Sequence, residues 1–514
     1  MRRRLNHIGK LFTRFTLLTT GLIAGSCDSF LDEIPDNRVE LNTLDKAAQL
    51  LTNGYSIASP AFTDWATDDV QYTLGTNIRP SQLEIYQWEE VDNGGPNEQD
   101  TPDFFWFQTY TAIAHANEVL AILDELPVLG DEDELKKDAL EGEAKLIRAY
   151  GHFMLANMFG EQYDPDEARD DLGVPYIKDP ETTFIQQYER ESLRKVYREI
   201  EDDLLDGLDL INDSFFLNSG KYHFNRNAAL AFASRFYLYK AGFQNGQDIR
   251  ESLRYSNELL GANPAAFVRD MTSSTFLQAK SSITGYPQLY SSPDQAANLL
   301  LMRKISLVQR TDFGFAAPND FYSGLFGQNP LPGTTDEREN PAFVKGLDLS
   351  GDQGLFPVRY ESLFERSSLN SNVGTPYHIG IMLRGEEVLF NRIECNILLN
   401  NFQAAIDDLN VLFSRRYSGG NTEVTLESLR TYIGVENDPS FSDFQVLFNV
   451  LIIEKRKEFI FQGMRWFDAK RWGIDMVHNL QDGSTIRLEF EDPRWVWQIP
   501  NSAIEVGGLE PNPR

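Results

Sequence analysis

Apolar residues recur every three or four positions along much of the chain. In one long stretch Trp106, Tyr110 and Ile113 fall on the same side of a helix. A later stretch with this spacing opens at Ser192, a residue type that caps helix N-termini. The sequence contains no strand-like alternation of comparable length. The pattern therefore predicts a mainly helical protein.

The predicted helices come in pairs of similar size. Residues 384–417 have the pattern of a helix, a short turn and a second helix, and Asn400 and Asn401 supply the turn. The length of this stretch matches the 34-residue period of tetratricopeptide repeats. Residues 228–261 form a second such pair. Because a repeat of this kind buries its apolar face only against a neighbour, we expect at least three stacked pairs.

Residues 263–377 lack a lasting helical period and are rich in Gly, Pro, Ser and aromatic residues. Long irregular segments inside a folded protein often carry function. We interpret this stretch as loops built onto the scaffold. The predicted fold is all-α: one domain over residues 43–514, with a tetratricopeptide-repeat scaffold mainly over 43–262 and 378–480 and aromatic-rich loops on one side.

The N-terminus has the layout of a secretory signal peptide. Arg2, Arg3 and Arg4 begin a basic segment, a short apolar run follows, and small residues precede Cys27. A cysteine at this position matches the bacterial lipobox, although Ala24 stands where that pattern usually has leucine. We predict a lipoprotein signal peptide over residues 1–26 and a lipidated tether over 27–42. The alternative is a signal peptide followed by an incidental cysteine.

Charge and cysteine content narrow the function classes. The chain has 47 Lys and Arg against 77 Asp and Glu, a formal net charge of -30. This balance argues against a nucleic-acid partner and against binding to anionic lipid through basic patches. The second of the two cysteines, Cys395, lies in a helical apolar pattern and is predicted to be a small buried hydrophobic residue.

Candidate catalytic and metal-binding groups have structural explanations. Glu454, Glu458 and Asp468 are predicted on helices rich in Lys and Arg, which favours an internal ion-pair network over acid–base or metal chemistry. His152 stands alone on a helix and is predicted to be structural. The acidic residues 164–171 offer a possible structural calcium site, but they lack the glycine and closing glutamate of an EF-hand. We predict no catalytic residue, no cofactor and no other metal site.

Several motifs in order resemble the SusD/RagB family of outer-membrane nutrient-binding lipoproteins, and the resemblance covers nearly the whole mature chain. The most specific motif is the one that starts at Ile452. The usual terminal Gly-Tyr of the family is absent, because the chain stops at Arg514. The motifs are WFQTYTAIAHANEVL from Trp106, GEAKLIRAYGHFMLANMFG from Gly142, GVPYI from Gly173, VYREIEDDL from Val196, RGEEVLFNRIECNILLNNFQAAIDDLN from Arg384, IIEKRKEFIFQGMRWFDAKRWG from Ile452 and WQIPNSAI from Trp497.

The resemblance implies a specific role. Such proteins are helical, are built on tetratricopeptide repeats and are lipid-anchored at the cell surface in the outer membrane. They capture an oligosaccharide or polysaccharide and deliver it to a SusC-like TonB-dependent transporter, and they are not enzymes. The alternative for this chain is the same fold with peptide or glycopeptide cargo, or a role mainly as a transporter lid.

A glycan site pairs aromatic ring faces with polar side chains, because a sugar ring has a C–H face and a rim of hydroxyls. The segment after residue 64 is rich in both kinds of residue, and the loops after Tyr286 offer an opposite wall. The candidate ligand-binding residues, chosen on composition, are Trp65, Asp68, Asp69, Tyr72, Asn77, Arg79, Trp88, Tyr290, Phe321 and Tyr322.

Overall fold

A computed structural model of the whole chain gives the architecture. It describes residues 41–73, 78–92, 94–168, 170–181, 186–216, 219–243, 245–310, 314–327, 329–339, 347–349, 352–421 and 423–514. Residues Thr43–Arg514 form one compact unit. The predicted signal peptide and lipidation site Cys27 lie outside the described residues.

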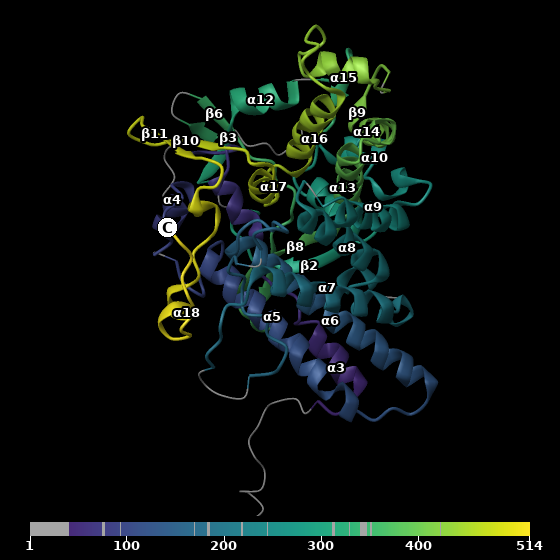
Figure 1. Cartoon of the computed structure of the whole chain (residues 1–514), viewed down its shortest axis with the longest axis vertical. Coiled ribbons are helices and arrows are strands. Elements are labelled where there is room, and N and C mark those ends of the chain that lie inside the picture. The colour runs from purple at the N-terminus through teal and green to yellow at the C-terminus, as the bar shows by residue number, and fades with distance from the viewer. Residues whose placement is uncertain are drawn as a thin grey trace, which may run out of the picture. The chain divides into compact units, whose positions relative to one another are not determined.

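Long helices that follow one another in the sequence pack side by side, as Figure 1 shows for α5 to α9. A second run of helices continues this packing, because α13 contacts both α8 and α9 and also pairs with α14. The fold is mostly helical, as the apolar periodicity predicts. The long helices of these two runs are α5 (Pro102–Ile122), α6 (Asp131–Phe159), α7 (Leu193–Leu210), α8 (Arg226–Ala241), α9 (Gly246–Leu260), α13 (Gly385–Leu398) and α14 (Phe402–Arg416).

Local sequence signals set the helix ends. The Ser192 hydroxyl accepts a hydrogen bond from the backbone N–H of Lys195, so the predicted cap of α7 is confirmed. Thr101 caps α5 in the same way, and Pro102 follows at the first helical position. Four acidic residues fill the first turn of α6, where the helix dipole favours negative charge.

Shorter helices flank these runs. The helix α3 packs against α5 and α6, and α15 packs against α16. The helix α17 ends at Trp472, and the residue that follows it, Gly473, adopts the left-handed conformation. These helices are α3 (Leu44–Leu51), α4 (Pro80–Tyr86), α15 (Leu426–Tyr432), α16 (Asp443–Phe459), α17 (Arg465–Trp472) and α18 (Asn501–Glu505), with a 3-10 helix over Pro60–Ala66.

The stretch predicted to be loop-rich contains short helices and the strands β2 to β7, and further short strands of the small antiparallel sheets lie outside it. One sheet has the order β2-β8-β7, and another has the order β1-β3-β6-β5. Two-stranded pairs form between β4 and β9 and between β10 and β11. The helices are α10 (Ser274–Ala279), α11 (Gly285–Tyr290) and α12 (Asn319–Gly327). The strands are β1 (Gln71–Tyr72), β2 (Asn298–Lys304), β3 (Phe315–Pro318), β4 (Thr335–Asp336), β5 (Leu347–Leu349), β6 (Asp352–Leu355), β7 (Leu363–Arg366), β8 (Gly374–Arg384), β9 (Tyr417–Ser418), β10 (Met476–Asn479) and β11 (Thr485–Leu488).

The junction between β8 and α13 lies in the core. Its three charged residues are all buried, and each has partners from a distant part of the chain. Arg384 donates to Gln462, and Glu387 accepts from Arg235 on α8. Glu386 accepts from the backbone N–H and the guanidinium of Arg269, at 2.9 and 2.8 Å. This junction therefore joins the sheet, both helical runs and the loop that follows α9.

The ion-pair network predicted around Glu454, Glu458 and Asp468 is confirmed. Glu458 accepts from the Nε and Nη2 atoms of Arg416 at 2.7 and 2.8 Å, and Glu454 accepts from Arg338 at 2.6 Å. Asp468 accepts from Lys455 and Arg471 at 2.8 and 3.1 Å. Although burial opposes its charge, the neighbouring arginines lower the pKa of Glu458 to about 2. These carboxylates act as structural partners of arginine and lysine.

Two single residues also have the structural roles predicted for them. Cys395 is a buried free thiol, and burial raises its pKa to about 12. His152 is buried and hydrogen-bonded at both ring nitrogens, since Ile177 N–H donates to its Nε2 and Nδ1 meets the carbonyl of Arg148. Burial lowers the pKa of His152 to about 3, so the ring is a neutral packing element.

Candidate functional site

A groove of about 500 Å³ lies between one face of α5, residues 175–181 and 186–188, and the chain around α18. This volume is within the range typical of ligand pockets. Helical spacing places Phe107, Tyr110, Thr111 and Ala114 on the same side of α5, and all four line the groove. Trp106 and Ile113 also line the groove and are buried.

Hydrogen bonds donated by α5 hold the second wall of the groove, which begins at Pro175. The Tyr110 hydroxyl donates to the carbonyl of Pro175 at 2.9 Å, and the Asn117 amide donates to the carbonyl of Ile177 at 3.0 Å. Farther along this wall, the Tyr188 hydroxyl donates to the carboxylate of Glu181 at 2.8 Å. Burial and the neighbouring Glu181 carboxylate raise the pKa of Tyr188, so its hydroxyl remains protonated at neutral pH.

The C-terminal segment supplies the third wall. The Asn512 side chain donates to the carbonyls of Phe159 and Trp497, at 3.1 and 2.7 Å. Leu509 is buried, whereas Val506 beside it is 56% exposed and lines the groove. The groove therefore offers apolar surface from Phe107, Ala503 and Val506 next to carboxylates and hydroxyls.

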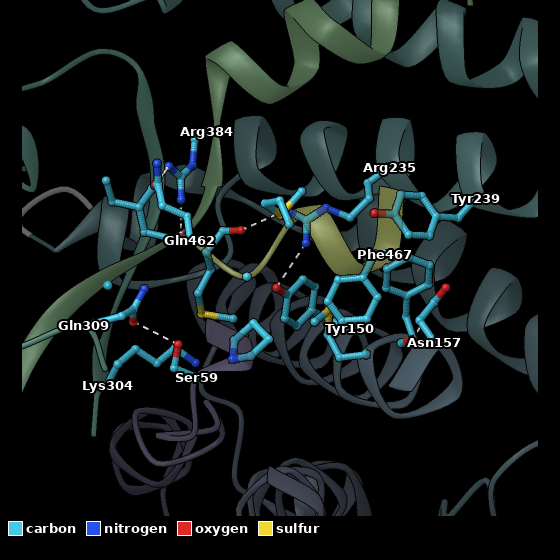
Figure 2. Close-up of a pocket in the computed structure, with 18 of the residues that line it drawn as sticks. Ser59, Tyr150, Asn157, Arg235, Tyr239, Lys304, Gln309, Arg384, Gln462 and Phe467 are labelled. Atoms are coloured by element: carbon cyan, nitrogen blue, oxygen red, sulfur yellow. Dashed lines mark hydrogen bonds between the residues drawn. The ribbon is translucent and has the colours of Figure 1, made fainter. Parts of the chain in front are cut away.

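A second hollow lies in the protein interior, between the scaffold helices and the β2–β8 ladder (Figure 2). Figure 2 shows Arg384 and Gln462 on one side and Arg235 with Tyr150 on the other. The Lys304 ammonium donates to the carbonyls of Ser56 and Ala58, and burial lowers its pKa to about 7. The hollow measures about 60 Å³, well below the size of a ligand pocket and suited to a few water molecules.

Most of the aromatic residues predicted to bind ligand lie in the core. Trp65 packs on Phe315, and Trp88 stacks on His478 and donates to the carbonyl of Ala66. Their ring faces are covered, so the structure does not support a role for these side chains as ligand platforms. The exposed fractions are 1% for Trp65, 5% for Tyr72, 3% for Trp88, 1% for Tyr290 and 3% for Tyr322.

Three of the candidates, Asp68, Asp69 and Phe321, are arranged around Arg456 of α16. The Arg456 guanidinium pairs with Asp68 at 2.9 Å and with Asp69, and it lies 4.5 Å from the ring centre of Phe321. Arg79 lies apart and pairs with Glu98 at 3.1 Å. Asp68, Arg79 and Phe321 are partly exposed, so ligand binding by them stays a prediction. Asn77 lies outside the described residues.

The groove residues were not among those predicted from composition. Phe107 and Tyr110 belong to a long helix that is apolar on most sides, so the sequence does not show which of its aromatic side chains are partly exposed. Tyr188 and Val506 belong to segments with little apolar periodicity. The sequence signal that could have identified this wall is the acidic Asp179-Pro180-Glu181, followed a few residues later by the aromatic Tyr188.

The described residues can also be examined for metal sites and for membrane-spanning helices. They contain no group of three or more His, Cys, Asp or Glu side chains placed to hold a metal ion. The possible calcium site at residues 164–171 includes one residue outside the described set and stays a prediction. None of the helices in the described part of the chain has the length and apolarity that crossing a membrane requires.

Comparisons with known proteins agree on one family. Residues 29–238 match a SusD-like family described as starch-binding and associating with the outer membrane, and residues 366–507 match the SusD family. No curated protein matches the sequence.

Solved structures share the fold at low sequence identity. A putative sugar-binding protein from Bacteroides vulgatus is 19% identical with a TM-score of 0.67, over 93% of this chain and 99% of that one. A SusD superfamily protein from Bacteroides thetaiotaomicron is 18% identical with a TM-score of 0.66, over 92% and 100% of the two chains. A laminarin-binding SusD-like protein is 16% identical with a TM-score of 0.56, over 92% and 99%.

Proposed function

Because the chain belongs to the SusD/RagB family, we propose that it is a lipid-anchored outer-membrane protein that captures an oligosaccharide or polysaccharide at the cell surface. It delivers this nutrient to a SusC-like TonB-dependent transporter and has no catalytic activity of its own. Similar folds in a putative sugar-binding protein and in a laminarin-binding protein support a saccharide as the cargo.

The observation that carries the proposal is the groove along α5. It combines the size of a ligand site, partly exposed aromatic side chains and polar groups at its rim. A sugar ring laid on Phe107 or Tyr188 buries its C–H face and leaves its hydroxyls near Asp179 and Glu181. The groove therefore provides both kinds of contact that saccharide binding needs.

Removing the aromatic surface tests this site. We expect Phe107→Ala and Tyr188→Ala each to weaken binding of a responsive oligosaccharide about tenfold or more, because each change removes ring contact with the sugar. Isothermal titration calorimetry against a panel of neutral oligosaccharides measures the effect. Phe364→Ala is the matched control, because Phe364 is 50% exposed on β7 and does not line the groove.

The outcomes separate the candidate functions. Unchanged affinity in both groove variants would place the saccharide elsewhere on the protein. Absence of binding to every glycan, together with copurification of a transporter, would favour the alternative of peptide or glycopeptide cargo or a lid function. Formation of a shortened saccharide would contradict the assignment as a binding protein.

Lipid anchoring is tested at Cys27. We expect Cys27→Ala to move the protein from the membrane fraction to the soluble fraction, because stable anchoring depends on acyl chains attached at this thiol. Fractionation of cells that lack the transporter, followed by immunoblotting, measures the change. The variant should keep the wild-type unfolding temperature. Tight membrane association of the variant in those cells would contradict anchoring through Cys27.

A further inference from the structure

The charge of the groove limits which saccharides it accepts. Among the described residues that line it, Asp179 and Glu181 are the charged ones, and both are exposed. The sequence between Glu181 and Gln186 contains no ionisable residue. The lining that the structure describes therefore has negative charge and no positive charge to offset it.

The two basic residues next to this wall are engaged elsewhere. Lys178 pairs with Glu199 of α7. The Arg190 guanidinium donates hydrogen bonds to four backbone carbonyls. They belong to Gly173 at 2.7 Å, to Glu510 at 2.9 Å, and to Phe159 and Leu172 at 3.2 Å. Arg190 thus holds the wall and the C-terminal segment together, and neither cation lines the groove.

The cation beneath the groove is also neutralised. Arg148 of α6 binds Asp203 through Nε and Nη2, at 2.6 and 2.8 Å, and donates to the Asn117 side chain at 3.2 Å. Asn117 in turn donates to Ile177, so its amide is occupied in holding the wall. Among the described residues, an anionic ligand in the groove therefore meets no guanidinium or ammonium group in the lining, and the cations next to it already have partners.

We infer that the groove selects saccharides without carboxylate or sulfate groups. Vicinal hydroxyls of such a sugar donate to the carboxylates of Asp179 and Glu181, while its C–H face packs against Phe107 and Val506. A uronate or a sulfated sugar brings a negative charge close to both carboxylates and gains no counter-charge. This inference rests on the proposed function, since it names the class of saccharide that the same groove binds.

A matched pair of ligands tests the inference on the purified full-length protein. The probes are linear glucan, galactan and mannan pentasaccharides, each compared with the same pentasaccharide after its C6 hydroxymethyl groups are oxidised to carboxylates. We expect the uncharged form to bind and the oxidised form to bind at least about tenfold more weakly in 50 mM NaCl. The ratio should shrink in 500 mM NaCl, because salt screens charges on an exposed rim.

Charge removal in the groove supplies the second measurement. The double variant Asp179→Asn with Glu181→Gln should reduce the ratio between uncharged and oxidised ligand to less than about threefold. The control is Glu132→Gln with Asp209→Asn, which removes the same charge from exposed positions on α6 and α7 outside the groove lining. This control should leave the wild-type ratio unchanged.

Each outcome decides the inference. Two results would overturn the charge selection and leave the proposed saccharide capture intact. In the first, the oxidised ligand binds as tightly as the uncharged one. In the second, the Asp179/Glu181 double variant keeps the wild-type ratio between the affinities for the two ligands. If no saccharide binds, and a lysine-rich peptide binds to the wild type but not to Phe107→Ala, both the inference and the proposed function are overturned. Absence of binding to every probe, charged or uncharged, refutes the proposed function and the inference with it.

Discussion

Replacing Arg416 with Met is expected to lower the free energy of unfolding by about 3–5 kcal/mol, because it leaves buried carboxylates without their main partner. The Arg416 side chain is completely buried, and its contacts to Glu458 at 2.7 and 2.8 Å form a two-pronged pair. It also approaches Glu386 at 3.3 Å and donates to the carbonyl of Arg269 at 2.5 Å. Its loss removes a junction between α14, α16 and the start of α13.

Guanidinium chloride unfolding of the two proteins at neutral pH measures this difference. The matched control is Arg254→Met, whose pair with Glu251 at 2.8 Å is about half exposed, and it should change stability by about 1 kcal/mol or less. A loss below about 1 kcal/mol in Arg416→Met would show that the network is not a main source of stability.

The same network predicts the response to acid. The pKa of Glu458 is about 2 in the folded protein, below its ordinary value of 4.5, because the neighbouring arginines outweigh the effect of burial. A carboxyl group with a lowered folded pKa contributes stability that is complete above its unfolded pKa and is lost as pH falls toward the folded value. The contribution of Glu458 should therefore decline between about pH 4.5 and pH 2.

The parts of the structure that depend on local sequence were predictable. Helical spacing identifies α5, and Ser192 marks the start of α7, because both signals act over a few residues. The structural role of Glu454 and Glu458 was also predictable, since a buried helix rich in lysine and arginine has to pair its charges. These inferences need no knowledge of which distant segments meet.

The candidate site depends on distant segments and was not predictable from composition. Trp88 and Tyr86 bracket the ring of His478, with centroid distances of 4.3 and 4.1 Å. His478 belongs to β10, far along the chain, so the local sequence around Trp88 does not reveal that its ring is covered. The groove likewise forms only where three segments that are far apart in the sequence meet, and none of them differs in composition from an ordinary helix or loop.

Replacing Gly385 with Ala is expected to destabilise the protein by about 3 kcal/mol or more, because the junction between β8 and α13 has no room for a methyl group. A Cβ atom at this position would lie 2.7 Å from the Cβ of Phe267 and would overlap the Phe267 carbonyl oxygen. The neighbouring residues cannot shift to relieve this overlap without breaking the buried pairs of Glu386 with Arg269 and Glu387 with Arg235.

Gly324→Ala is the matched control for this substitution. Gly324 lies within α12, is exposed and has no heavy atom within 4 Å of an added Cβ. Alanine there should be neutral or should stabilise the protein by up to about 1 kcal/mol, since glycine is a poor helix former. Thermal and guanidinium chloride unfolding of the two variants distinguishes crowding at the junction from a general effect of replacing glycine. Equal stability of the two variants would contradict the close approach of Phe267 to the start of α13.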